Sequence, residues 1–138
     1  MSGDKAGTVI VVDDDPMFRE ELVTMLEEEG YEVQSFESGA HAVRYMQDRP
    51  WSWVPKLLIT DIVMEGVGGY QLIRRMGELY PGKNVPIIVV SRLYSADYVY
   101  EAEVAGASSY LQKPVQPQKL MQAIAKAQSK AKGPMAVF

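Results

Sequence analysis

The sequence has no cysteine and a single histidine, His41. Without cysteine there is no disulfide, no thiolate nucleophile and no cysteine-ligated zinc, and one histidine does not make a histidine metal site. No apolar run approaches the roughly 20 residues that a membrane-spanning helix needs, and the first eight residues are small and polar. We therefore expect a soluble, cytoplasmic chain that makes no membrane contact.

Excess positive charge is also lacking. The 138 residues carry 14 lysines and arginines against 18 aspartates and glutamates, for a net charge of −4. Phosphate backbones and anionic lipid surfaces attract basic proteins, so the balance disfavours direct nucleic-acid binding. A length of 138 residues suits one ordinary domain.

Short apolar runs alternate with helical patterns along the whole chain. Strands are expected over Val9–Val12, Tyr31–Phe36, Leu57–Thr60, Val85–Val90 and Ser109–Leu111, and helices over 16–30, 40–47, a stretch around Leu72–Met76, 96–104 and 118–130. Such alternation favours a parallel sheet with right-handed crossovers. The predicted fold class is α/β: a doubly wound (βα)5, flavodoxin-like three-layer sandwich with sheet order 2-1-3-4-5.

Acidic residues gather at one edge of this predicted sheet. Asp13 and Asp14 follow the first strand and Asp61 follows the third, which is its neighbour in the predicted order. Two carboxylates about 4 Å apart repel by roughly 4 kcal/mol even at an effective dielectric of about 20. Either their pKa values rise or a cation joins them, and a site built only of oxygen ligands suits Mg²⁺ better than zinc.

The ends of the other strands add a hydroxyl and an ammonium group. Ser91 follows the fourth strand and Lys113 the fifth, so both are expected at the same edge as the carboxylates. Carboxylates, a hard cation and a lysine suit phosphoryl transfer, which depends on positioning and charge neutralisation. An aspartate can itself be the nucleophile and form an acyl phosphate.

These motifs carry a resemblance to a known family. Ser91 lies 30 positions after Asp61, and Lys113 lies 22 positions after Ser91. The runs that match are Val11-Val12-Asp13-Asp14-Asp15-Pro16, Asp61-Ile62-Val63-Met64 and Tyr110-Leu111-Gln112-Lys113-Pro114. In this order and spacing they resemble the receiver domain of two-component response regulators. The resemblance assigns residues 8–132 to that domain, 1–7 to an N-terminal extension and 133–138 to a C-terminal tail.

The resemblance implies a phosphoacceptor site. Asp61 would accept a phosphoryl group from a sensor histidine kinase or a histidine phosphotransfer protein. Mg²⁺ would be bound by Asp14, Asp61 and the main-chain carbonyl of Val63, with Asp13 acting mainly through water. Lys113 would pair with the phosphoryl group as a point charge. Beyond accepting and losing this group the chain would not be an enzyme.

The resemblance also implies a switch. Ser91 would hydrogen-bond the phosphoryl group, and the ring of Tyr110 would rotate into the space that the hydroxyl leaves. The surface of the fourth helix, fifth strand and fifth helix would then change for protein partners. Pro114 matches a family proline that often follows a cis peptide bond.

Two positions depart from the family pattern. Glu65 stands where the family usually has proline, and Arg92 stands where it usually has a small residue. Both follow neighbouring strands, so we predict that they form an ion pair over the site. An exposed pair contributes only about 0–1 kcal/mol, so its effect would be on access to Asp61.

Aromatic residues suggest one surface and one packed region. Tyr94, Tyr98, Tyr100 and Tyr110 fall within 17 positions. Tyrosine-rich surfaces favour protein contacts, so we predict that the 94–110 region binds a downstream protein or a second copy. Trp51 and Trp53 precede the third strand, and packing is their expected role.

Three other functions share parts of this pattern. A receiver-like module that binds proteins without phosphorylation would have lost an acid, the hydroxyl or the lysine, and none is lost. An aspartate-nucleophile phosphatase of the haloacid dehalogenase type would use Asp13 and Asp15, but it usually has Thr or Val where this chain has Met17. A flavin-binding module is disfavoured because three acids replace its phosphate loop. No output domain is recognisable after Pro134, so the chain is either a stand-alone regulator or a piece of a longer one.

Overall fold

The computed structural model describes residues 5–129 and 135–138 of the chain. Strands and helices alternate in the order β1 (Thr8–Val12), α1 (Pro16–Glu28), β2 (Glu32–Phe36), α2 (Gly39–Gln47), β3 (Leu57–Thr60), α3 (Gly69–Leu79), β4 (Ile87–Ser91), α4 (Ala96–Ala105), β5 (Ser109–Gln112), α5 (Pro117–Gln128) and β6 (Ala136–Val137). None of the helices in the described part is both long and apolar enough to span a bilayer. The predicted alternation is confirmed, with element ends displaced by a few residues.

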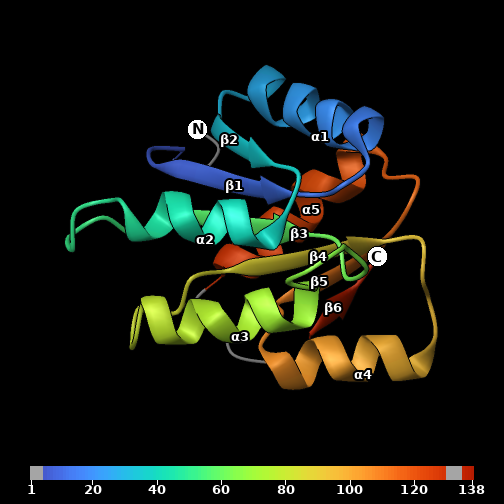
Figure 1. Ribbon diagram of the computed structural model, residues 1–138. Coiled ribbons are helices and arrows are strands. Elements are labelled where there is room, and N and C mark those ends of the chain that lie inside the picture. The colour runs from blue at the N-terminus through green and yellow to red at the C-terminus, as the bar shows by residue number, and fades with distance from the viewer. Residues whose placement is uncertain (1–4, 130–134) are drawn as a thin grey trace.

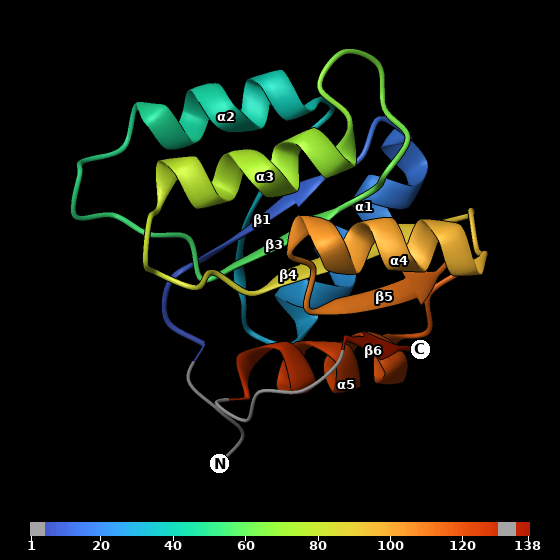
Figure 2. The same ribbon diagram turned by 90° about the horizontal axis from the view of Figure 1, so that it is seen from below.

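The elements form three layers around one parallel sheet. The strand order is β2-β1-β3-β4-β5-β6, and each neighbouring pair is parallel. α1 and α5 cover one face of the sheet, and α2, α3 and α4 cover the other (Figures 1 and 2). The predicted doubly wound fold and the order of its first five strands are confirmed.

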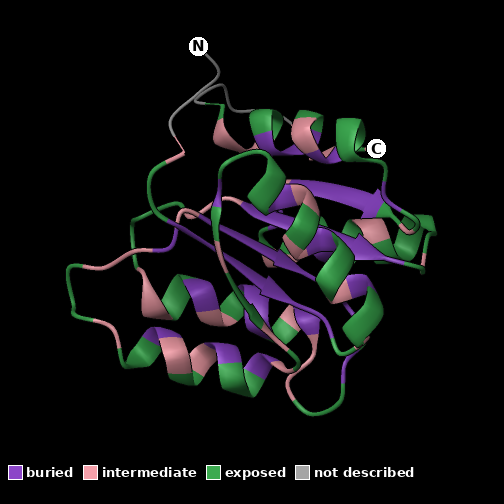
Figure 3. Ribbon diagram, turned by 90° about the horizontal axis from the view of Figure 1, so that it is seen from above, coloured by how far each residue is buried: buried purple, intermediate pink, exposed green. Residues whose placement is uncertain are grey.

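The central strands are buried on both faces, as their unbroken apolar runs predict. Alternate residues of β1 point to opposite sides: Val9 and Val11 pack with α1 and α5, and Ile10 and Val12 pack with the other three helices. Figure 3 shows the strands as a buried layer between helices whose outer sides are exposed. The two cores hold the strand ends, and hence the residues that follow them, in fixed positions.

Two features of the sequence place the site-bearing loops. The Asp15 side chain caps α1 by accepting hydrogen bonds from the N–H groups of Met17 and Phe18. At the start of α3, a Cβ atom on Gly69 would lie 2.1 Å from the carbonyl oxygen of Asp61. Only glycine lets this helix begin so close behind Asp61.

The end of the chain adds a strand that was not predicted. Residues 133–138 were expected to be a tail, but Ala136–Val137 forms β6 and pairs in parallel with β5. Two paired residues are too few to give a recognisable strand pattern. Residues 133 and 134 lie outside the described part of the chain.

The two tryptophans have different surroundings. Trp53 packs against Tyr45 and Tyr80, with ring centroids 6.0 and 6.3 Å away. The packing role is therefore confirmed for Trp53. It is wrong for Trp51, which is 97% exposed in the turn that precedes β3.

Candidate functional site

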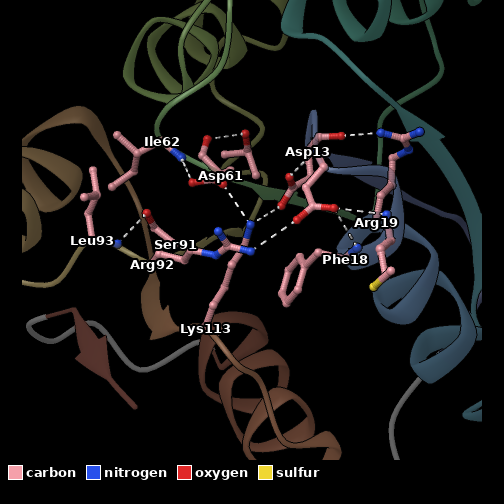
Figure 4. A network of polar contacts seen from close by, with 12 residues as sticks. Asp13, Phe18, Arg19, Asp61, Ile62, Ser91, Arg92, Leu93 and Lys113 are labelled. Carbon is pink, nitrogen blue, oxygen red and sulfur yellow. Dashed lines mark hydrogen bonds and ion pairs between the residues drawn. The ribbon is translucent and has the colours of Figure 1, made fainter.

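Four strand ends meet at the carboxyl edge of the sheet. Asp13 directly follows β1, Asp61 follows β3, Ser91 is the last residue of β4 and Lys113 follows β5. In a parallel sheet these ends share one edge. Figure 4 shows the side chains of Asp13, Asp61 and Lys113 pointing toward one another.

Lys113 lies between the two carboxylates. Its Nζ atom is 2.7 Å from Oδ2 of Asp13 and 2.9 Å from Oδ2 of Asp61. The three side chains are only 6%, 1% and 11% exposed for Lys113, Asp13 and Asp61. The ammonium group also lies 4.0 Å from the centroid of the Phe18 ring. The predicted convergence of an acid from β1, an acid from β3 and the lysine is confirmed.

Burial and charge act on these groups in opposite directions. Burial raises the pKa of Asp13 above its usual value, although Lys113 pulls that pKa down. Burial alone would lower the pKa of Lys113, but the short contacts with both carboxylates outweigh it and leave the pKa raised. Asp13, Asp61 and Lys113 thus form a buried group with one ammonium and two carboxyl groups. A further positive charge would be bound favourably there.

Backbone groups fix the second oxygen of each acid. Oδ1 of Asp13 accepts a hydrogen bond from the Asp15 N–H at 2.9 Å, and Oδ1 of Asp61 accepts one from the Ile62 N–H at 2.6 Å. In Asp61 this leaves Oδ2 directed at Lys113. The carboxylate is therefore oriented by its own loop as well as by the lysine.

Asp14 is not part of this buried group. Its side chain is exposed, and no hydrogen bond or ion pair links it to Asp61 or Lys113 in the described part of the chain. Accordingly, the described residues contain no group of three acids, histidines or cysteines placed to hold a metal. The prediction that Asp14 faces Asp61 is not met in this arrangement, because the loop after β1 turns only Asp13 inward. Val63 is also exposed, at 60%.

Ser91 and Tyr110 are linked through one residue that the sequence did not single out. The Ser91 Oγ accepts a hydrogen bond from the Leu93 N–H at 3.1 Å, and the Tyr110 hydroxyl donates to the Leu93 carbonyl. Burial raises the pKa of Tyr110 to about 12, so the hydroxyl keeps its proton at neutral pH. The Ser91 and Tyr110 hydroxyl groups thus bind the backbone N–H and carbonyl of the same residue, at the start of the loop to α4. No side-chain pattern marks Leu93, because it acts through its backbone.

The tyrosine-rich region divides into surface and core. Tyr94, Tyr98 and Tyr100 are 53%, 38% and 63% exposed, as a contact surface requires. Tyr110 is fully buried, so its inclusion in that surface is wrong. It lies on β5 beneath Tyr94, with the ring centroids 6.1 Å apart.

The predicted ion pair between Glu65 and Arg92 is wrong. Arg92 Nη2 instead lies 3.4 Å from Oδ2 of Asp15. The cap of α1 engages Oδ1 of Asp15 and leaves Oδ2 for this contact. Arg92 and Asp15 line a cavity of about 440 Å³, which Lys113 also lines. Because the Arg92 side chain is 78% exposed, its ion pair with Asp15 contributes at most about 1 kcal/mol to the free energy of unfolding.

Comparisons with known proteins agree with this geometry. Residues 9–125 match the family model of the response regulator receiver domain. The chain is 31% identical to protein PilH of Pseudomonas aeruginosa, over 84% of this chain and 93% of PilH. It is 30% identical to the phosphate regulon transcriptional regulatory protein PhoB of the same organism, over 83% of this chain and 48% of PhoB.

A solved structure gives the same result in three dimensions. A response regulator receiver domain protein (CheY-like) from Methanospirillum hungatei superposes with a TM-score of 0.76 at 26% identity. The superposition covers 87% of this chain and 91% of that one. The sheet order, the acids and lysine at its carboxyl edge and the match over 9–125 lead to one conclusion: the chain belongs to the response regulator receiver domain family.

Proposed function

We propose that this receiver domain works by reversible phosphorylation of Asp61, supplied by a sensor histidine kinase or a histidine phosphotransfer protein. The observation that carries the proposal is the orientation of Asp61, whose Oδ2 lies 2.9 Å from Lys113 Nζ beside buried Asp13. An oriented carboxylate next to a fixed ammonium suits attack on a phosphoryl group.

Phosphoryl transfer to Asp61 forms one bond to phosphorus and breaks another. A carboxylate oxygen of Asp61 attacks phosphorus, and the bond from phosphorus to the donor's imidazole nitrogen breaks. The donor ring carries a proton on its other nitrogen, so the electron pair of the broken bond leaves with a neutral imidazole, and Asp61 becomes an acyl phosphate. Lys113, freed from part of its contact with the carboxylate, pairs with the phosphoryl oxygens.

The residues that would hold Mg²⁺ fit this ion by the chemistry of their donor atoms. Oδ2 of Asp13 is buried and receives no well-directed hydrogen bond in the described part of the chain, although Lys113 Nζ lies 2.7 Å away. Asp13, Asp14, Asp61 and the main-chain carbonyl of Val63 offer only oxygen, which hard cations prefer. When bound, Mg²⁺ neutralises the charge that collects on the carboxylates and the phosphoryl oxygens. Asp14 is exposed and has no hydrogen bond or ion pair with any other described residue, so it is free to join such a site.

The signal then passes through the segment that Ser91 and Tyr110 share. A phosphoryl group on Asp61 draws the Ser91 hydroxyl toward it and away from the Leu93 N–H. Since Tyr110 binds the carbonyl of the same residue, its ring responds, and the surface of α4, β5 and α5 changes for a protein partner. The chain acts as a switch and not as an enzyme that turns over substrates.

Intact-mass measurement after incubation with acetyl phosphate tests the proposal. The native chain should gain one phosphoryl group in Mg²⁺ and none in excess EDTA. Asp61→Asn should gain none in either condition, while Glu65→Gln, an exposed loop variant, should behave as the native chain does. Uptake by a folded Asp61→Asn chain would overturn the proposal, and so would no uptake by the native chain in Mg²⁺.

A further inference from the structure

The outer edge of β5 is covered by a very short segment of the same chain. The N–H groups of Ala136 and Phe138 donate hydrogen bonds to the carbonyl oxygens of Ser108 and Tyr110, with N···O distances of 3.3 and 2.9 Å. Between these donors the N–H of Val137 faces away from β5, as every second residue does in a parallel pair. The edge is therefore bound through backbone groups that any extended segment has.

Two side chains of this segment show what the edge selects. Met135 packs against the core cluster that contains Ala102 of α4, and Phe138 packs against the opposite cluster, beside α5. Residues three positions apart in a strand point to opposite faces, so one large apolar side chain serves each core. The Met135 N–H adds a hydrogen bond to Oε2 of Glu103 at 2.9 Å.

The segment is held by few contacts. Among the residues that the structure describes, only Ala136 and Val137 pair with β5. Val137 is 41% exposed, and a cavity of about 390 Å³ remains beside Phe138, lined also by Pro114 and Lys119. Without this cover, β5 would present a row of unpaired backbone groups, which are a template for strand addition. Because Met135–Phe138 is weakly held and the β5 edge can pair with any extended strand, another strand can replace this segment.

We propose that the outer edge of β5 is a strand-binding site that Met135–Phe138 occupies within the chain. Its ligand in another protein is an extended segment with the same spacing, that is, large apolar side chains at its first and fourth residues. Addition of a strand to a sheet edge supplies affinity through the backbone and specificity through alternate side chains. The internal segment competes with that ligand and sets how much of it binds. Strand binding at this edge needs no phosphorylation of Asp61.

Two proline variants of the full chain test whether Met135–Phe138 can be released from β5. One removes a hydrogen bond to β5, and the other places the same residue type in the segment without removing such a bond. Ala136→Pro removes an N–H that bonds β5, whereas Val137→Pro removes one that faces away. Phe138→Ala, which keeps the backbone and removes one anchoring side chain, serves as a second route to release. Thermal unfolding by circular dichroism checks that each variant is folded.

The probe is the acetylated peptide Pro-Met-Ala-Val-Phe, followed by amide shifts of Ser108–Leu111 in ¹⁵N-labelled protein. If the segment is docked in more than nine molecules of ten, its release strengthens the apparent affinity for the peptide at least about tenfold. We expect that gain for Ala136→Pro, a smaller gain for Phe138→Ala, and native behaviour for Val137→Pro. A peptide with alanine in place of its phenylalanine should bind more weakly.

Two results would overturn the assignment. One is that the folded Ala136→Pro and Phe138→Ala chains show no peptide-dependent shifts along β5. The other is that both bind the peptide no better than the native chain does. Phosphorylation of Asp61 plays no part in either readout, so failure here is distinct from failure of the proposed phosphoacceptor role.

Discussion

At the scale of single residues, the site is built on one ammonium group that two acids of unequal exposure share. Asp13 is almost fully buried and has a raised pKa, whereas Asp61 is held partly by the Ile62 N–H. A buried carboxylate with a raised pKa is one whose ionisation is unfavourable in the folded state. Binding of a cation at the site would therefore make ionisation of these carboxyl groups more favourable.

This charge predicts a specific pH trend for Asp13→Asn. The pKa of Asp13 is higher in the folded chain than the unfolded value of 3.8, so the native chain binds more protons when folded. Its stability relative to the variant is greatest below 3.8 and falls as the pH rises through the folded pKa. Urea unfolding of both chains from pH 4 to pH 7 should show that the free energy of unfolding of the variant rises relative to that of the native chain as the pH increases. A trend in the opposite direction would contradict the electrostatic account.

Asp14 offers a test of the metal site that does not disturb the fold. It is exposed and has no hydrogen bond or ion pair in the described part of the chain, so Asp14→Asn should change the free energy of unfolding by no more than about 0.5 kcal/mol. Loss of one charged ligand should weaken Mg²⁺ binding about tenfold or more in titration calorimetry. Glu20→Gln, on the exposed side of α1, is the matched control and should bind as the native chain does. Equal affinity in all three chains would remove Asp14 from the site.

The sequence predicted which strand ends bring residues together, but not how every side chain turns. Asp13, Asp61 and Lys113 could be placed because they directly follow buried strands. Asp14 and Arg92 lie in loops, where direction depends on local hydrogen bonds. Arg92 pairs with Asp15 because the cap of α1 leaves one carboxylate oxygen free, a detail that spacing does not encode.

At the scale of elements, α3 is positioned by one glycine. Gly69 lets its first turn approach the Asp61 carbonyl, where a Cβ atom would lie at 2.1 Å. Gly77, in the same helix, has nothing within 4 Å of its Cβ position. Substitution at Gly69 therefore tests the close approach of the helix to Asp61, and substitution at Gly77 tests helix propensity alone.

We expect Gly69→Ala and Gly77→Ala to have effects of opposite sign. Gly69→Ala forces the loop after Asp61 to move and should lower the free energy of unfolding by about 1–3 kcal/mol. Gly77→Ala should raise it by about 0.5–1 kcal/mol, since alanine is the better helix former. Thermal and urea unfolding check both values. Equal stabilisation by the two changes would mean that the contact behind Asp61 is not restrictive.

Elements with strong local signals were predictable and the short one was not. α1 has Pro16 at its start and Asp15 as its cap, and α2 has Ser38 as its cap, which are ordinary helix-start signals. β6 has two residues and exists through pairing with β5 and packing of Phe138. Its stability comes from contacts with distant parts of the chain, which a local pattern does not contain.

At the scale of the whole molecule, the carboxyl edge of the sheet, which is the proposed phosphoacceptor site, and the tyrosine surface are joined through β5 and the loop to α4. Tyr98 and Tyr100 are exposed on α4, while Tyr110 beneath this region is buried and bonded to Leu93. A change near Ser91 can therefore reach the α4 surface through Leu93 and through Tyr110, which belongs to the core cluster beneath α4. This connection supports the proposed role, in which phosphorylation of Asp61 changes the surface offered to a partner.

The tyrosine surface predicts an effect on association. If Tyr98 and Tyr100 bind a second copy, the phosphorylated native chain should form dimers, and the double change to serine should weaken them at least tenfold. Sedimentation velocity over a range of concentrations measures this. Replacing Trp51 with serine, at the opposite edge of the sheet, is the control for a lost exposed aromatic. Unchanged association in the double variant would exclude this surface as the contact between copies.

We propose that Asp61, and no neighbouring acid, carries the phosphoryl group. Borohydride reduction converts an aspartyl phosphate to homoserine, and peptide sequencing by mass spectrometry then gives its position. After treatment with acetyl phosphate and Mg²⁺, we expect homoserine at position 61 and unmodified aspartate at 13, 14 and 15. Homoserine at any of those three positions, with aspartate intact at 61, would contradict it.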